Sequence, residues 1–106
     1  AMQRVGMTVD LSHCADKTTM DAIAAAKKPL VFTHAAARGL MPGYARCKSD
    51  DAIRALARNG GVMGIAAIRF MIKPEGPVTV EHFVDHIDYV IKLVGAEHVG
   101  IGSDLD

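Results

Sequence analysis

The sequence contains no tryptophan, few aromatic residues and no surplus of charge of either sign. Aromatic residues make up 5% of the 106 positions, and twelve basic residues balance twelve acidic ones. Nucleic acids and anionic membranes attract proteins with a basic field, and single-stranded nucleic acids also need aromatic stacking platforms. We therefore expect no nucleic acid and no membrane among the partners, and we expect a cytoplasmic protein.

Cysteine is also scarce. Cys14 and Cys47 do not form a CxxC pair, and two cysteines do not make a disulfide framework. They are interpreted as reduced thiols of a reducing compartment. Because Cys47 lies between Arg46 and Lys48, its pKa is expected to be lowered, but no catalytic partner lies close to it in the sequence.

Long hydrophobic runs are absent. No apolar run reaches eighteen residues, and the N-terminus lacks a basic stretch followed by an apolar core, so the sequence predicts neither a membrane span nor a signal peptide. Residues 1–7 look like the end of a helix, and residues 102–106 stop in what should be a functional loop. We therefore expect residues 1–106 to be one partial domain, truncated at both ends.

Half of the residues are hydrophobic, and they form short apolar runs that alternate with helical patterns. Ser49, followed by Asp50 and Asp51, is a good start for a helix, and so is Thr79. The pattern predicts strands at residues 7–11, 29–33, 62–66 and 98–102. It predicts helices at residues 16–27, 49–58 and 79–93, and long loops at residues 35–48 and 69–78.

The alternation of strands and helices predicts an α/β fold with a parallel sheet and right-handed crossovers. Two architectures fit, namely an open α/β sheet and part of a (β/α)8 barrel. A complete barrel needs about 250 residues, so four strands with three helices would make about half of one. In both architectures, ligands bind at the C-terminal ends of the strands.

Polar residues follow three of the four predicted strands. His13 follows the first strand, His34 the second and Asp104 the last. Imidazole nitrogens and carboxylate oxygens are the ligands of hydrolytic zinc sites. A single histidine after a strand usually only stabilises a loop, but two on consecutive strands together with an aspartate favour a site.

Several segments resemble the membrane (renal) dipeptidase family, peptidase family M19, and they occur in the same order. They are VDLSH at 9–13, PLVFTH at 29–34, DDAIR at 50–54, NGGVM at 59–63, HFVDHI at 82–87 and VGIGSDLD at 99–106. The resemblance covers nearly all of this chain but only the latter half of the usual family length. It implies a (β/α)8 TIM barrel, of which this chain would supply strands 5–8.

The resemblance also implies a zinc-dependent dipeptidase, a hydrolase that carries two zinc ions joined by a bridging glutamate and a water or hydroxide. His13 and His34 would bind the second zinc ion. Arg46 would bind the substrate carboxylate. Asp104 would contact the amino end of the dipeptide and assist proton transfer.

The match to the family pattern is incomplete. Family members often have Ser and Asn where this chain has Ala35 and Cys47, and Arg38 is an alternative to Arg46. The family's His-x-Asp near its first strand and its bridging glutamate fall outside the matched part. Hydrolytic zinc sites usually have three protein ligands, so two histidines should form at most one partial, weak zinc site.

Three hypotheses follow for function. The parent protein is a zinc dipeptidase, or it is another amidohydrolase-like barrel enzyme such as a lactonase or deaminase. Alternatively, the chain is a non-catalytic half-barrel that self-associates or pairs with the missing half, because half a barrel has two open sheet edges. His82 and His86 share a helix face but lack an obvious third ligand, and they are interpreted as an exposed structural face.

Overall fold

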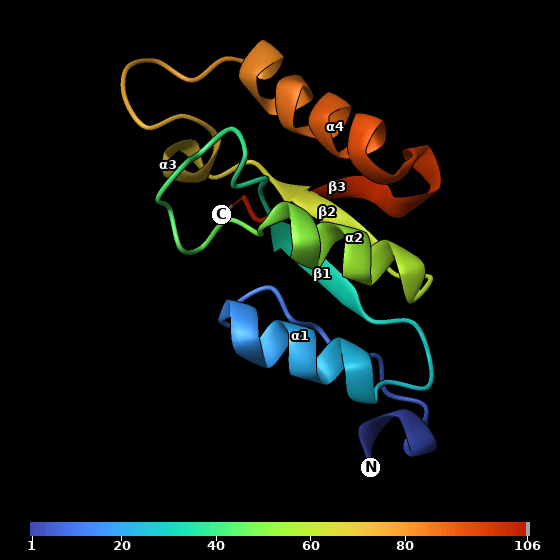
Figure 1. The fold of residues 1–106 in the computed structure, drawn as a ribbon. Helices are drawn as coiled ribbons and strands as arrows, with labels where there is room; N and C mark the ends of the chain where they lie inside the picture. Colours follow the sequence, from blue (N-terminus) through green and yellow to red (C-terminus); the bar gives the residue numbers. More distant parts are fainter. Residues whose placement is uncertain (106) are drawn as a thin grey trace.

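A computed structural model describes residues 1–105 of the chain. Its centre is a parallel sheet with the strand order β1-β2-β3, formed by β1 (Val31–Ala35), β2 (Val62–Ala66) and β3 (Val99–Ser103) (Figure 1). Both strand pairings are parallel. The predicted α/β fold with a parallel sheet is therefore confirmed.

Two of the helices precede β1, and the others occupy the connections between the strands. In the part of the chain that the structure describes, four are α-helices, α1 (Asp16–Ala25), α2 (Asp50–Arg58), α3 (Arg69–Ile72) and α4 (Val80–Val94), and two are short 3-10 helices, η1 (Met2–Val5) and η2 (Ala96–His98). α2 packs between α1 and α4 (Figure 1). Within residues 1–105, none of these helices combines the length and the apolar character needed to cross a membrane.

Local capping signals explain why α2 and α4 begin where the sequence predicts. The Ser49 hydroxyl accepts a hydrogen bond of 3.3 Å from the backbone N–H of Ala52, which satisfies one free donor of the first turn of α2. In α4, the backbone N–H of Thr79 donates to Nδ1 of His82 at 3.1 Å, as part of a capping box. The segment 69–78 differs from prediction, because a single helical turn, α3, forms there.

The first predicted strand, residues 7–11, is wrong. This segment makes only an isolated parallel bridge, in which Asp10 pairs with Val31. Two backbone hydrogen bonds accompany it, from Leu11 N–H to the Val31 carbonyl at 2.9 Å and from Val31 N–H to the Val9 carbonyl at 3.2 Å. Directly after the bridge the chain turns at Ser12 and His13, where the Cys14 N–H donates a hydrogen bond of 3.1 Å to the Leu11 carbonyl, so the ladder stays short. Within residues 1–105 the sheet has three strands, and the four-stranded half-barrel is not confirmed.

The helices cover one face of the sheet and leave the other open. Phe32 and Met63, which are partners across β1 and β2, are fully buried together with Ile65. Side chains alternate between the two faces of a strand. Thr33 and Val62, which point the other way, are exposed. The sheet therefore has a packed face and an open face.

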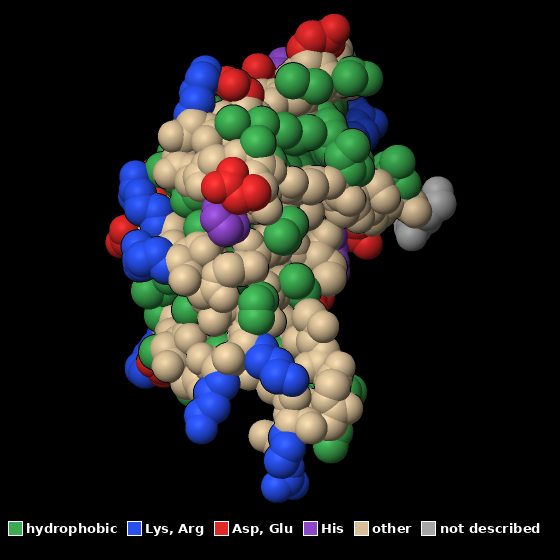
Figure 2. All heavy atoms as spheres, turned by 90° about the vertical axis from the view of Figure 1, so that its right-hand side faces the viewer, with side chains coloured by type: hydrophobic (Ala, Val, Ile, Leu, Met, Phe, Trp, Pro, Cys, Tyr) green, Lys and Arg blue, Asp and Glu red, His purple; other side chains and the backbone are tan. Residues whose placement is uncertain are grey.

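Hydrophobic and basic side chains gather on different parts of the surface. Figure 2 shows hydrophobic side chains gathered over the upper part of the molecule, around α4 and β3, and Lys and Arg side chains at the lower end, where the N-terminus lies in Figure 1. Ile101 of the edge strand β3 is 75% exposed. The apolar surface thus includes the edge of the sheet.

Candidate active site

His13 and His34 face each other at the edge where the strands end. His34 belongs to β1, and His13 lies in the turn that follows the bridge between Asp10 and Val31. Their Nε2 atoms are 2.9 Å apart, and the rings meet edge to face with centroids 5.0 Å apart. His13 is exposed and His34 is half-buried, so solvent reaches the pair. The fold therefore brings together two predicted site residues that are 21 positions apart.

The spacing of the two Nε2 atoms suits two ligands of one metal ion. Two nitrogens bound to one tetrahedral zinc at about 2.0–2.1 Å lie roughly 3.3 Å apart, within about half an ångström of the spacing seen here. Across residues 1–105, no group of three or more His, Cys, Asp and Glu side chains is placed to hold a metal ion. The histidine pair therefore fits part of a zinc coordination shell.

Asp10 joins the two segments that carry the histidines. Its Oδ1 accepts hydrogen bonds from the backbone N–H and the hydroxyl of Ser12, at 3.0 and 2.6 Å, and from the backbone N–H of Thr33 at 3.1 Å. Its Oδ2 accepts a hydrogen bond of 2.7 Å from the Thr33 hydroxyl. That hydroxyl lies 2.8 Å from Nδ1 of His34. We call this series of contacts the Asp10–Thr33–His34 relay.

The hydrogen bonds also keep Asp10 charged. Partial burial raises the pKa of this carboxyl group, but the hydrogen bonds from Ser12 and Thr33 outweigh burial and lower the pKa to about 2. Asp10 is not among the site residues that the sequence predicts. Its place at the end of an extended segment, where polar side chains gather, is the signal that could have identified it.

The two candidate arginines lie in different surroundings. Arg46 donates a hydrogen bond of 2.8 Å to the Ser12 carbonyl, and its Nη2 lies 3.3 Å from Nε2 of His13. Arg38 makes a two-pronged ion pair with Asp16, at 2.6 and 2.9 Å. The guanidinium beside the histidines is therefore that of Arg46.

A buried lysine, which the sequence pattern did not indicate, holds the turn that carries His13. The Lys48 ammonium donates hydrogen bonds to the carbonyls of Leu11 and Cys14, at 2.7 and 2.8 Å, and lies 4.8 Å from the centre of the Phe32 ring. Burial lowers the pKa of this lysine. Lys48 is 2% exposed, so this cation is part of the interior.

Asp104 lies at the predicted edge but apart from the histidines. It follows β3, which is separated from β1 by β2 in the strand order, and among residues 1–105 it does not join His13 and His34 in a group of three side chains placed to hold a metal ion. Ser103 and Asp104 have left-handed backbone conformations, with φ of 39° and 60°. Such conformations cost about 1–3 kcal/mol in residues other than glycine and gather at functional sites.

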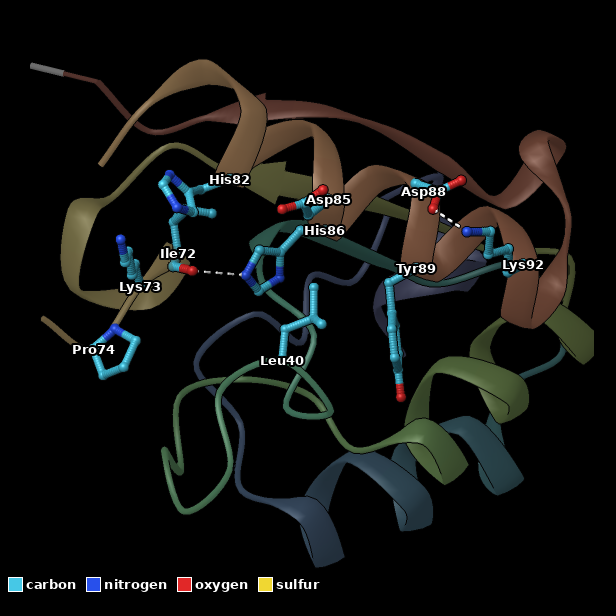
Figure 3. A pocket seen from close by; sticks show the side chains of 10 residues that line it. All are labelled: Leu40, Ile72, Lys73, Pro74, His82, Asp85, His86, Asp88, Tyr89 and Lys92. Atoms are coloured by element: carbon cyan, nitrogen blue, oxygen red, sulfur yellow. Dashed lines mark hydrogen bonds and ion pairs between the residues drawn. The ribbon is translucent and has the colours of Figure 1, made fainter. Parts of the chain in front are cut away.

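The other histidine pair, His82 and His86, has a structural environment. Both line a cavity of about 390 Å³ between α4, Leu40 and the segment after β2 (Figure 3). His86 is 1% exposed, so the prediction of an exposed face is wrong for this residue. It forms a His-x-Asp triplet with Asp88, but both of its ring nitrogens are within 3.1 Å of backbone groups. Both ring nitrogens of His86 are therefore used in hydrogen bonds within the fold.

The expectation for Cys47 is also wrong. Burial raises the pKa of the Cys47 thiol to about 11, although Arg38 and Arg46 partly oppose this effect. Its Sγ lies 3.7 Å from the carbonyl of Met71. Neighbouring cations in the sequence therefore do not activate this thiol, because the side chain points into the core. Cys14 and Cys47 are both free thiols, as predicted.

Comparisons with known proteins agree on one family. The family described as membrane dipeptidase (peptidase family M19) matches residues 1–106. An uncharacterized dipeptidase of Schizosaccharomyces pombe is 40% identical over 107 residues, which cover 99% of this chain and 26% of that protein. The chain thus spans about a quarter of the length of such relatives.

Solved structures show the same similarity. An amidohydrolase from Pseudomonas aeruginosa superposes with a TM-score of 0.91 at 35% identity, covering 98% of this chain and 32% of that chain. A metallo peptidase from Rhodobacter sphaeroides, bound to a phosphinate mimic of the dipeptide L-Ala-D-Ala, superposes with a TM-score of 0.90 at 28% identity, covering 97% and 30%.

Proposed function

Because the chain belongs to the membrane dipeptidase family, peptidase family M19, we propose that it is part of a zinc-dependent enzyme that hydrolyses dipeptides. The observation that carries the proposal is the convergence of the His13 and His34 Nε2 atoms to 2.9 Å at the edge where ligands of such folds bind. The bound dipeptide mimic in the R. sphaeroides metallo peptidase supports dipeptides as the substrate class.

Four residues have separate roles in the proposed reaction. His13 and His34 hold one metal ion, which, when bound, polarises the scissile carbonyl and lowers the pKa of a bound water. Arg46 binds the substrate carboxylate through paired N–H donors, which suits a planar guanidinium. The ion pair of Arg38 with Asp16 supports Arg46 for this role. Asp104 carries a proton toward the leaving amine.

Metal titration of the 106-residue chain tests the histidine pair. We expect weak binding of zinc or cobalt with a stoichiometry of one, because the described residues supply two ligands. His13→Ala and His34→Ala should each abolish this binding, whereas the control His82→Gln should retain it. Calorimetry and the absorption spectrum of bound cobalt are the readouts. Unchanged binding in both site variants would rule out this pair as the ligands.

Dipeptide hydrolysis by a full-length family member that carries this segment tests the reaction. We expect Arg46→Lys to raise KM more than it lowers kcat, because Arg46 is proposed to bind the ground-state carboxylate. Asp104→Asn should lower kcat by about 10²–10⁴-fold, the usual contribution of a general acid–base. A zinc- or cobalt-loaded protein that cleaves no dipeptide would refute the proposal.

A second candidate function is a different amidohydrolase-type reaction. The similarity to the P. aeruginosa amidohydrolase, at 35% identity, favours keeping this alternative. The same metal-loaded protein should then hydrolyse lactones or deaminate heterocyclic amines while leaving dipeptides intact. A substrate panel that includes both classes separates the two candidates.

A third candidate is a non-catalytic chain that associates with a second copy or with the rest of a barrel. The exposure of Ile101 on the edge strand β3 favours it. Light scattering of the 106-residue chain should then show a dimer or larger species. A stable monomer at high concentration would contradict this candidate.

A further inference from the structure

The Asp10–Thr33–His34 relay determines where protons lie near the histidine pair. A carboxylate can only accept hydrogen bonds, so the 2.7 Å contact between Asp10 Oδ2 and Thr33 Oγ1 requires the threonine hydroxyl to donate. Threonine has one hydroxyl proton. Toward His34, at 2.8 Å, the same oxygen therefore presents a lone pair.

This direction assigns the tautomer of His34. Nδ1 of His34 must carry the proton that it donates to Thr33, and in the neutral ring Nε2 is then left with a lone pair. That lone pair points to Nε2 of His13, 2.9 Å away. The Arg46 guanidinium can only donate, and its Nη2 lies 3.3 Å from Nε2 of His13, so that ring nitrogen also faces a donor. The relay therefore assigns the tautomer of His34 alone.

Asp10 also controls the backbone at His34. The Ser12 hydroxyl donates to Asp10 Oδ1 at 2.6 Å and accepts a hydrogen bond of 3.1 Å from the backbone N–H of His34. One carboxylate thus orients His34 along two routes, through its ring and through its main chain. Histidines that bind metals commonly donate their second ring N–H to such a partner, which sets both tautomer and orientation.

We propose that Asp10 is a positioning residue that, through Thr33, holds His34 in its Nδ1–H tautomer and so keeps Nε2 free as a metal ligand. The metal part of this inference rests on the proposed function. The tautomer part concerns the metal-free chain and is tested separately.

The substitution Asp10→Asn should reverse the direction of the hydrogen bonds that run from His34 through Thr33 to residue 10. Three donors converge on Oδ1, namely the backbone N–H and hydroxyl of Ser12 and the backbone N–H of Thr33, so the asparagine oxygen must take that place. The asparagine NH2 group then faces Thr33 Oγ1 and donates to it. The threonine hydroxyl turns toward His34 Nδ1, and the ring proton moves to Nε2.

Long-range ¹H–¹⁵N NMR of the ring nitrogens measures this directly. In metal-free wild-type protein at neutral pH, we expect His34 to be protonated at Nδ1. In Asp10→Asn, His34 should be protonated at Nε2. The affinity of the Asp10→Asn variant for zinc should fall about 10–100-fold, which is the usual effect of losing the hydrogen-bond partner of a metal-binding histidine.

Threonine variants give a second test that does not alter Asp10. Thr33→Val keeps the shape but removes the hydroxyl, so His34 should lose its single tautomer and zinc should bind more weakly. Thr33→Ser retains the hydroxyl and should keep the wild-type NMR pattern and zinc affinity. This matched pair remains informative if Asp10→Asn does not fold.

The outcomes test the tautomer of His34 separately from the effect of the relay on metal binding. Wild-type His34 protonated at Nε2, or an unchanged tautomer in both Asp10→Asn and Thr33→Val, would overturn the assignment. The expected tautomers with no zinc binding in any variant would support the relay and refute the metal site of the proposed function. Equal zinc affinity of Thr33→Val and Thr33→Ser would overturn the role of the relay in metal binding.

Discussion

His86 accepts a hydrogen bond of 3.1 Å at Nδ1 from the backbone N–H of Ala37, which lies 49 positions earlier in the chain. Its Nε2 donates to the carbonyl of Ile72, also at 3.1 Å. One buried ring of α4 thus joins the loop after β1 to the segment after β2. Because Nδ1 must keep its lone pair, both hydrogen bonds require the neutral imidazole.

We expect this buried ring to make the chain less stable in acid. Burial lowers the pKa of His86, and this effect exceeds the opposing effects of the Ile72 carbonyl and the Asp85 carboxylate. The unfolded chain therefore takes up a proton near the ordinary histidine pKa of about 6.5, whereas the folded chain does so only at lower pH. The free energy of unfolding should be greatest above that pH and should fall as the pH drops toward the folded pKa. Urea denaturation at a series of pH values measures this slope.

The variant His86→Leu assigns the slope to this residue. At neutral pH it should lower the free energy of unfolding by about 1–3 kcal/mol, because it leaves two buried backbone groups without partners. It should also flatten the dependence on pH. The control His82→Gln changes a histidine of the same helix and should keep the slope that His86 contributes. If the free energy of unfolding of His86→Leu depends on pH as steeply as that of the wild type, another group is responsible for the dependence.

The sequence predicted those elements whose signals are local. α2 begins after Ser49 and β2 spans Val62–Ala66, as expected, because a capping side chain and an apolar run bounded by Gly61 act within a few residues. The segment 7–11 was predicted as a strand on the same kind of evidence. A strand also needs a partner along its length, and this segment has only the bridge of Asp10 to Val31.

In the candidate site, too, some features could be predicted from the sequence and others could not. The chain order could predict that His13 and His34 lie at one edge of the sheet, although His13 follows an isolated bridge rather than a strand and His34 lies within β1. The distinction between Arg38 and Arg46 could not, because it depends on Asp16, which folds against Arg38 from 22 positions away. The burial of His86 depends likewise on the loop that packs on α4. Such contacts between distant segments leave no local pattern in the sequence.

Lys48 provides a test of how the His13 turn is held. We expect Lys48→Met to lower the free energy of unfolding by about 1–3 kcal/mol, because the carbonyls of Leu11 and Cys14 lose their buried donor. Amide hydrogen exchange around His13 should also become faster. The control Lys92→Met removes an exposed lysine and should change stability by less than about 1 kcal/mol. Equal effects of the two variants would argue against a structural role for Lys48.

Cys47 should be unreactive in the folded chain. With a pKa of about 11, roughly one thiol in a thousand is ionised at pH 8, and the thiolate is the reactive form. The Cys14→Ser variant, in which Cys47 is the remaining thiol, should therefore react with a disulfide reagent only as fast as the chain unfolds. The Cys47→Ser variant retains the half-buried Cys14 and should react faster. Rapid labelling of folded Cys14→Ser would contradict the burial of Cys47.

Gly102 lies against the backbone of the relay, and a side chain there should disturb it. A β-carbon at Gly102 would overlap the Thr33 carbonyl oxygen and lie 3.1 Å from the carbonyl carbon of Gly64. These are backbone atoms that cannot rotate away. Gly100, two residues earlier in β3, is a matched control, because a β-carbon there would meet a side-chain carbon of Val62 at an ordinary 3.9 Å.

We therefore expect Gly102→Ala to lower the free energy of unfolding by about 1–3 kcal/mol, as overpacking usually does. The ring NMR signals of His34 should shift as Thr33 moves. Gly100→Ala should leave those signals in place and change stability by less than about 1 kcal/mol in either direction. Denaturation curves and NMR spectra of the two variants measure both effects. Equal stability of the two variants would mean that β1 and β3 do not approach each other as closely as the structure indicates.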